Sequence, residues 1–189
     1  GVGVFSATVR AAGNQTITAT DTVTAAITGT SSDVTVSTGA ATHYAVLAPA
    51  SAIGGVAFNF TVTALDQFNN TVTGYPGTVH FTSNDANAIL PADATLTNGV
   101  GTFSATLRTA GSRTLTATDT VSAAITGTSN AVSVSAAPAT HFTVSAPASA
   151  TGGVAFNFTV TAQDQFDRAT TREAGTVPFA GSYCHDRLP

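Results

Sequence analysis

The sequence contains no lysine, methionine or tryptophan, and one cysteine among its 189 residues. Charged residues make up 8% of the chain, against roughly 25% in a typical soluble domain. Arginine supplies all the basic charge, and the net charge is −4. Because binding along a phosphate backbone requires clustered lysine and arginine, we expect no nucleic-acid partner. A single cysteine cannot form an internal disulfide, so the fold must be held by packing.

Long apolar runs and reactive motifs are also missing. No stretch approaches the roughly 18 apolar residues that a membrane span requires, so we expect no membrane span. The opening GVGVFSATVR lacks both an initiating methionine and the layout of a signal peptide, and we expect a fragment or processed piece. Nucleophile elbows, zinc helices and phosphate-binding glycine loops are not found, so we expect no cofactor and no enzyme activity.

A long internal repeat organises what is present. The segment ATHYAVLAPASAIGGVAFNF from Ala41 recurs as ATHFTVSAPASATGGVAFNF from Ala139, 98 positions later, and GVGVFSATVR from Gly1 recurs as GVGTFSATLR from Gly99 at the same shift. Self-similarity at a fixed period indicates a repeat architecture. The shift predicts the C-terminal half of one repeat over 1–38, a complete repeat over 41–137, and the N-terminal half of another over 139–189, divergent after 166.

Each repeat alternates apolar and polar residues with period two, the pattern of half-buried strands. In AFNFTVTA, for example, Phe58, Phe60 and Val62 point one way and Asn59 and Thr61 the other. Glycine, asparagine and proline mark turns between strands expected near 43–49, 56–65, 77–83, 93–97, 100–108, 112–119 and 130–136. Seven such strands predict an all-β fold of immunoglobulin-like β-sandwich repeats, one complete and two partial, in which the second strand pairs with the fifth and the third with the sixth.

Phrases such as ALDQFNNTVTGYPGTVHFTSND and GVGTFSATLRTAGSRTLTATDT resemble the tandem immunoglobulin-like repeats of bacterial surface and secreted proteins, akin to invasin/intimin-type and filamin-type modules. The resemblance implies an extracellular or cell-surface location. It also implies a non-catalytic spacer or adhesive role, with a cell-surface or polysaccharide ligand as a possible partner. The alternative is an accessory, carbohydrate-binding-like module or fragment of an extracellular hydrolytic enzyme. Since sugars stack on exposed aromatic rings and tyrosine occurs only three times, that alternative is weaker.

Side chains able to carry chemistry are few. Cys184, within YCHD, is interpreted as a free thiol in a tail, with an intermolecular disulfide as the alternative. His43 and His141 share one repeat position and should lie a domain apart, which favours a structural role over a shared metal site. Aspartates beside turns, such as Asp66 and Asp119, are expected to cap the backbone. Calcium binding at such carboxylates stays an open alternative.

The two half repeats lead to a hypothesis of exchange. Each half would expose an apolar face and unpaired strand edges, and segments of roughly 40 residues rarely bury enough surface to fold alone. We therefore expect a homo-oligomer, either a dimer or a filament, in which half repeats from different chains complete one another. The predicted complementation interface packs Phe5, Val9 and Ile17 of one chain against Phe156, Phe158 and Val160 of another.

Overall fold

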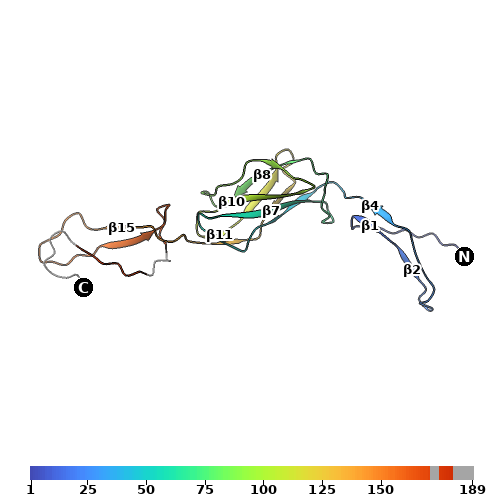
Figure 1. Cartoon of the computed structure of the whole chain (residues 1–189), viewed down its shortest axis with the longest axis horizontal. Helices are drawn as coiled ribbons and strands as arrows, with labels where there is room; N and C mark the ends of the chain where they lie inside the picture. The colour runs from blue at the N-terminus through green and yellow to red at the C-terminus, as the bar shows by residue number, and fades with distance from the viewer. Residues whose placement is uncertain (171–174, 181–189) are drawn as a thin grey trace. The chain divides into compact units, whose positions relative to one another are not determined.

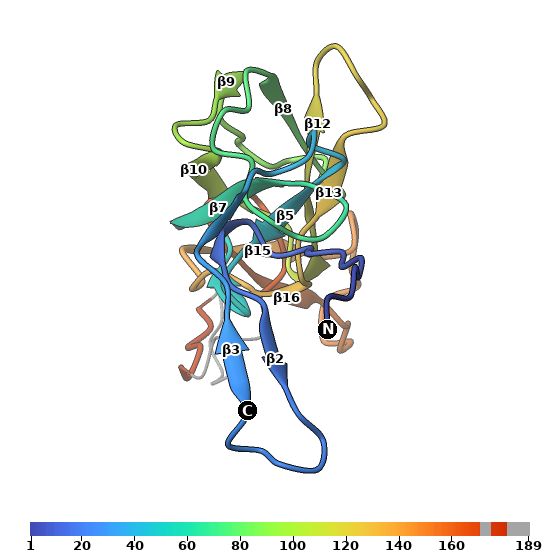
Figure 2. The ribbon, with the colours of Figure 1, turned by 90° about the vertical axis from the view of Figure 1, so that its right-hand side faces the viewer.

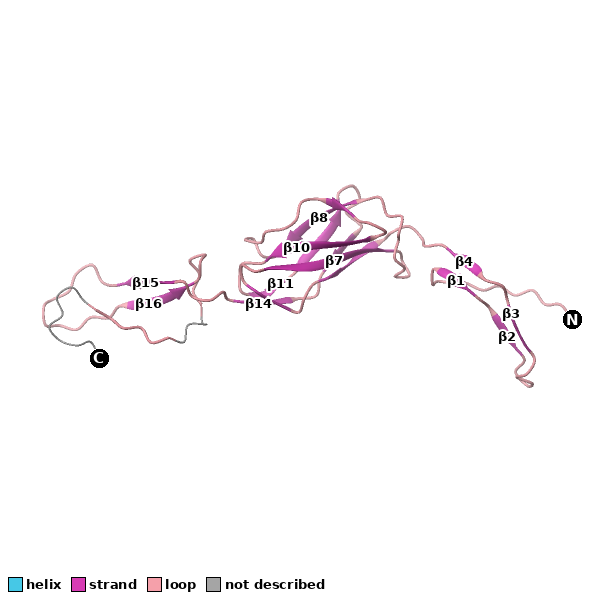
Figure 3. Ribbon diagram, in the orientation of Figure 1, coloured by secondary structure: helices cyan, strands magenta, loops and turns pink. Residues whose placement is uncertain are grey.

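The computed structural model describes residues 1–170 and 175–180. Within them the chain forms strands β1 to β16 and no helix, as Figure 3 shows, so the predicted all-β class is confirmed. No helix of the described part is therefore long and apolar enough to cross a bilayer. The chain divides into two compact units, Gly1–Val134 and Ser135–Pro189, and each is described by itself.

The complete repeat is built from three antiparallel sheets, several strands of which are labelled in Figure 1. The first has the order β10-β7-β5, the second β13-β12-β8-β9 and the third β11-β14-β6. The bounds of these strands are β5 His43–Leu47, β6 Ser51–Ile53, β7 Ala57–Leu65, β8 Thr78–Ser83, β9 Ala94–Thr95, β10 Val100–Thr106, β11 Gly111–Arg113, β12 Leu115–Asp119, β13 Thr126–Thr128 and β14 Val132–Ser135.

The two predicted long-range pairings are confirmed. Strand β7, the expected second strand, pairs with β10, the expected fifth, with Phe60 opposite Phe103. Strand β8, the third, pairs with β12, the expected sixth, with Phe81 opposite Ala117.

The sixth expected strand is divided in two, and an extra strand precedes the seventh. The expected strand 112–119 forms β11 and β12, and a strand not predicted, β13, precedes β14 and pairs with β12. The division follows from side chains that interrupt the ladder. The hydroxyl of Ser129 accepts from Leu115 N–H at 3.0 Å, and the Asn130 side-chain oxygen accepts from Ala48 N–H at 3.1 Å. These bonds let the backbone change sheets there.

The core lies between the strand faces on which the period-two pattern places the apolar side chains. Three phenylalanine rings meet there: the buried Phe60 and Phe81 have centroids 5.7 Å apart, and Phe81 and the partly buried Phe103 have centroids 4.6 Å apart. Around them pack the fully or almost fully buried side chains of Val62, Val79, Leu107, Leu115 and Val132. Each large apolar side chain removed from water contributes roughly 1.5–3 kcal/mol, so this cluster stabilises the complete repeat.

One buried polar network crosses the core. The Tyr44 and Tyr75 hydroxyls lie 2.6 Å apart, and the Tyr75 hydroxyl donates to the Asp119 carboxylate. Burial is the main cause that raises the pKa of each tyrosine, and the bond from Tyr75 is the main cause that lowers the pKa of Asp119. Both hydroxyls are therefore bound inside the repeat, which satisfies polar groups that would be costly if left unpaired.

Threonine hydroxyls on neighbouring strands bind each other across one sheet surface. Across β12 and β13, Thr116 meets Thr128 at 3.0 Å and Thr118 meets Thr126 at 2.9 Å. The N-terminal half repeat holds the equivalent pairs, Thr18 with Thr30 and Thr20 with Thr28. Such cross-strand pairs stabilise a sheet without bringing in charge.

The half repeats form short hairpins. The first contains β1 Gly13–Gln15, β2 Thr18–Thr20, β3 Thr28–Thr30 and β4 Val34–Val36, and the last contains β15 His141–Ser145 and β16 Thr159–Gln163. Figure 2 shows β2 and β3 side by side. The registers repeat those of the complete repeat: Ala19 faces Gly29 as Ala117 faces Gly127, and β15 pairs with β16 as β5 pairs with β7. The division into three repeats at the sequence-derived boundaries stays a prediction.

Candidate functional site: the uncovered faces of the half repeats

Strand structure is lost where the partner strand is missing. Residues 2–8 occupy the repeat positions of β10 but form no strand. Residues 155–158 correspond to 57–60 and also form no strand. In the complete repeat, residues 57–60 pair with β10 alone, whereas residues 61–65 also pair with β5. Strand β16 is therefore limited to the residues that pair with β15, the equivalent of β5. Residues 2–8 lack a partner equivalent to β7, and residues 155–158 lack a partner equivalent to β10. Each of these two segments is thus the equivalent of the partner that the other lacks.

The N-terminal half repeat presents its core positions to solvent. Phe5 is 93% exposed and Ile17 48% exposed, and Val9 is partly exposed. In the complete repeat, Leu115 (equivalent to Ile17) is 1% exposed, Leu107 (equivalent to Val9) is fully buried and Phe103 (equivalent to Phe5) is partly buried. We call the surface formed by Phe5, Val9 and Ile17 the donor face.

The C-terminal half repeat contains an apolar groove of about 510 Å³. The three predicted residues on this side, Phe156, Phe158 and Val160, all line it. Its other walls come from β15 and from the segment 177–180, namely Phe142, Val144, Ala146, Val177, Pro178, Phe179 and Ala180. Phe60 and Val62, the equivalents of Phe158 and Val160, are buried in the core of the complete repeat, and we call this groove the acceptor groove.

A pair of phenylalanine rings is already assembled in the acceptor groove. Phe158 and Phe179 have centroids 5.1 Å apart and planes at 80°, close to the 5.7 Å and 83° of Phe60 and Phe81. The complete repeat adds a third ring, Phe103, whose equivalent is Phe5. Sequence analysis missed Phe179 because the chain diverges after 166, although this phenylalanine stands 98 positions beyond Phe81. The acceptor groove therefore holds two of the three rings of the core.

The donor face belongs to the unit Gly1–Val134 and the acceptor groove to the unit Ser135–Pro189. The structure thus brings Phe156, Phe158 and Val160 together. Their packing against Phe5, Val9 and Ile17 stays a prediction.

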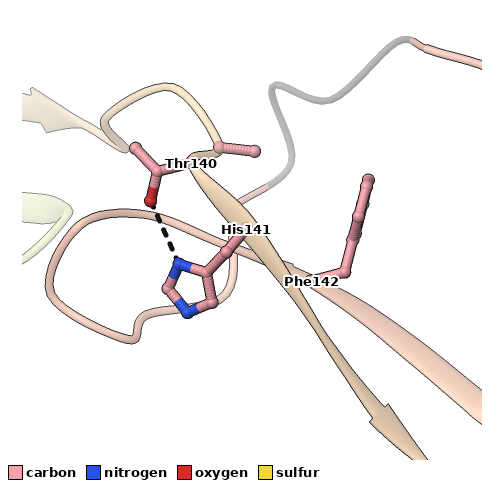
Figure 4. Close-up of a pocket in the computed structure, with 4 residues that line it drawn as sticks. Thr140, His141 and Phe142 are labelled. Atoms are coloured by element: carbon pink, nitrogen blue, oxygen red, sulfur yellow. Dashed lines mark hydrogen bonds between the residues drawn. The ribbon is translucent and has the colours of Figure 1, made fainter.

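The recurring histidines hold the start of a strand to a turn. The His43 ring contacts the Thr42 hydroxyl through Nδ1 at 3.0 Å and the Asn69 side-chain oxygen through Nε2 at 3.1 Å. His141 contacts Thr140 in the same way at 3.1 Å, as Figure 4 shows, and its Nε2 lies 3.1 Å from Asp167. The pocket beside His141 is small, about 180 Å³. These contacts support the structural interpretation.

The aspartates beside turns cap the backbone as predicted. Asp66 accepts from the N–H groups of Phe68 and Asn70, and Asp119 accepts from those of Val121 and Ser122. Among the described residues no cluster of three or more histidine, cysteine and acidic side chains suits a metal ion. Cys184 lies outside the described residues.

Comparison with known proteins finds no matching family model and no matching curated protein. Solved structures that match include those of the surface layer protein SbsC. The S-layer protein rSbsC is 20% identical over 76% of this chain and 19% of that chain, with a TM-score of 0.39. SbsC domains 4–9 are 23% identical over 80% of this chain and 26% of that chain, with a TM-score of 0.41. The chain thus spans a fifth to a quarter of these proteins, and scores below 0.5 assign it neither family nor function.

Proposed function

We propose that this chain is a non-catalytic structural module of an extracellular or cell-surface repeat protein, and that two copies join by completing each other's half repeats. The observation that carries the proposal is that the same chain has an open acceptor groove and a donor face whose residues are equivalent to the core residues that the groove lacks. The module acts mechanically: rigid sandwiches in series set a distance, and the completed repeats connect one chain to the next.

The register of the exchanged strand follows from the complete repeat. There, β10 pairs with β7 with Ser104 opposite Asn59 and Phe103 opposite Phe60. Moved by one repeat, residues 2–8 of one copy pair with 155–161 of another, with Ser6 opposite Asn157 and Phe5 opposite Phe158. Phe5 then lies beside the Phe158–Phe179 pair as the third ring. Strand addition to an open edge is a common mode of protein recognition, in which backbone bonds give affinity and side-chain pockets give specificity.

Burial provides the driving force for the exchange. Phe5 is almost fully exposed and Phe158 is 37% exposed, whereas Phe60 in the complete repeat is 2% exposed. Because apolar surface removed from water contributes roughly 25 cal/mol per Å², covering both faces at once favours association. Exchange between two copies forms a closed two-fold dimer with two composite repeats, and a head-to-tail arrangement forms a filament.

The alternative of a carbohydrate-binding accessory module of a hydrolytic enzyme lacks its usual side chains. Tyr44 and Tyr75 are 3% and 9% exposed, and their hydroxyls bind each other and Asp119. Neither ring is available to stack on a sugar. The proposed ligand of the adhesive function, a cell-surface or polysaccharide group, therefore has no tyrosine platform in the described residues.

A disulfide test distinguishes the proposed register from other contacts. In a Cys184→Ser background, Ser6→Cys with Asn157→Cys should form a disulfide between chains, because antiparallel partners have Cβ atoms about 4.5–5.5 Å apart. Ser104→Cys with Asn59→Cys is the matched positive control, since these residues face each other inside the complete repeat. Ser6→Cys with Thr161→Cys displaces the second cysteine by about 13 Å along the strand and should not cross-link.

Mass on a non-reducing gel, together with light scattering over a concentration series, gives the result. Covalent dimers or ladders from the first pair alone support the exchange. A monomeric disulfide within one chain would contradict exchange between copies, and equal cross-linking of the displaced pair would contradict the register. A monomer at every concentration that forms no cross-link would exclude the proposal.

A further inference from the structure

The turn Asp66–Asn70 at one end of the complete repeat contacts the half repeat that precedes it. Asp66 is 1% exposed, and one of its carboxylate oxygens accepts from the N–H groups of Phe68 at 2.8 Å and Asn70 at 2.9 Å. Asn69 takes a left-handed conformation with φ of 63°. This bonding fixes the turn, so the side chain of Asn70 is presented in a set direction.

The side-chain amide of Asn70 binds the backbone of the preceding half repeat through both its nitrogen and its oxygen. Its nitrogen donates to the Arg10 carbonyl at 2.8 Å, and its oxygen accepts from Ala12 N–H at 2.9 Å. The second amide hydrogen goes to Asp66 at 3.0 Å. Both amide hydrogens and one lone pair of the oxygen are thus used in hydrogen bonds. The Asn70 side chain therefore links the two repeats by hydrogen bonds to the backbone.

Two further contacts join the same pieces. The second carboxylate oxygen of Asp66 accepts from Gly39 N–H, in the connecting segment, at 3.0 Å. The Arg10 guanidinium lies 5.4 Å from the centroid of the Phe68 ring, within the range of a cation–π contact. The bonds to Asn70, Gly39 and Phe68 lower the pKa of Asp66 to about 2, with the Asn70 side chain as the largest cause. Residues of the turn Asp66–Asn70 therefore make each of these contacts with the preceding half repeat and the connecting segment.

The next repeat keeps the turn but changes the residue at the position of Asn70. Asp164 accepts from Phe166 and Arg168 N–H groups, and Asp167 has φ of 59°, so the backbone geometry recurs. Arg168 stands where Asn70 stood, and its guanidinium lies 5.3 Å from the Phe166 ring. Because arginine has donors and no acceptor, it cannot receive a backbone N–H as Asn70 receives that of Ala12.

We infer that the turn Asp66–Asn70 is a repeat-docking site whose partner is the backbone of the Arg10–Ala12 loop in the preceding repeat, with residue 70 as the specificity-determining position. An asparagine there holds neighbouring repeats together through two backbone hydrogen bonds, one donated and one accepted, whereas an arginine has no acceptor and cannot make the second of them. This inference concerns neighbours along one chain and does not depend on exchange between copies.

Amide hydrogen exchange on the full chain tests the docking site directly. The Ala12 N–H should exchange more slowly than that of Ala11 in the unchanged protein. Asn70→Ala and Asn70→Arg should speed exchange at Ala12 by about tenfold, the effect of losing one or two net hydrogen bonds. Protection at Phe68 should persist, because its bond to Asp66 does not involve the Asn70 side chain. Asn59→Ala, the same change on an exposed strand position, is the matched control.

Each result bears on the inference. Faster exchange at Ala12 in both Asn70 variants, with Phe68 unchanged and the Asn59 variant silent, supports it. Rapid exchange at Ala12 in the unchanged protein would overturn it, as would full protection in the arginine variant. Loss of protection at Phe68 together with Ala12 would assign Asn70 to folding of the turn and would also overturn the docking role.

Discussion

The complete repeat and the half repeats place nearly the same residues in different surroundings. Hairpin registers are shared, as β12–β13 and β2–β3 show. Burial is not shared: Val132 is fully buried, whereas its equivalent Val34 is 45% exposed. Strand β10 also forms, whereas residues 2–8, with almost the same sequence, do not form a strand. Local pairing thus follows from neighbouring sequence, but the closing strands need a partner from the other half of a sandwich.

The sharpest way to break this comparison is to remove one ring at equivalent positions. Phe60→Ala should lower the free energy of unfolding of the complete repeat by about 3–5 kcal/mol, the range for buried Phe→Ala changes. Phe158→Ala should change this free energy of unfolding by less than about 0.5 kcal/mol in dilute protein, as substitutions at exposed positions usually do. Urea unfolding followed by tyrosine fluorescence measures this, because Tyr44 and Tyr75 are buried in the complete repeat. Equal losses for both variants would contradict the open core of the C-terminal half.

A pair of glycines sharpens the comparison further. A Cβ at Gly127 would collide with the Tyr44 carbonyl, whereas a Cβ at the equivalent Gly29 would meet nothing within 4 Å. Gly127→Ala should therefore destabilise the complete repeat by about 1–3 kcal/mol, as overpacking does. Gly29→Ala should leave monomer stability unchanged and weaken self-association, because in a composite repeat residue 29 meets the carbonyl of Phe142 from the second copy. Unchanged association of the Gly29 variant by light scattering would argue against sandwich completion.

The smallest expected effect is on the stability of the complete repeat at low pH. Asp119 receives the Tyr75 hydroxyl, which chiefly lowers its pKa below 3.8, and the exposed Asp21 has a pKa lowered by the N–H groups of Thr24 and Val23. A lowered folded-state pKa contributes stability above 3.8 that is lost as the pH falls below that value. Asp119→Asn should flatten the acid limb of the tyrosine-reported unfolding curve. Asp21→Asn should leave this limb as it is, and an equal flattening would mean that both aspartates support the same core.

Much of the fold was predictable from the sequence, because the period-two pattern and the 98-residue shift identify inner faces and equivalent residues directly. The pairings of β7 with β10 and of β8 with β12 were predicted on that basis. Strand β13 was not, since its Thr126–Thr128 sequence lacks an apolar alternation and its place depends on close approach of Gly127 to β5. The pattern predicted three of the residues that line the acceptor groove, Phe156, Phe158 and Val160, but not Phe179. For Asp66 it predicted a capping role, with calcium binding as the alternative, but not the contact with the preceding repeat, because the bond from Asn70 to Arg10 joins residues 60 positions apart.

The threonine pairs across β12–β13 and β2–β3 carry one more consequence. Ionic strength weakens attraction between exposed charges but leaves hydroxyl-to-hydroxyl bonds unscreened. Across these strand pairs hydroxyl groups bond to hydroxyl groups, so these contacts do not depend on attraction between charges. The contacts between the threonine strands should therefore persist at high and at low salt concentration alike.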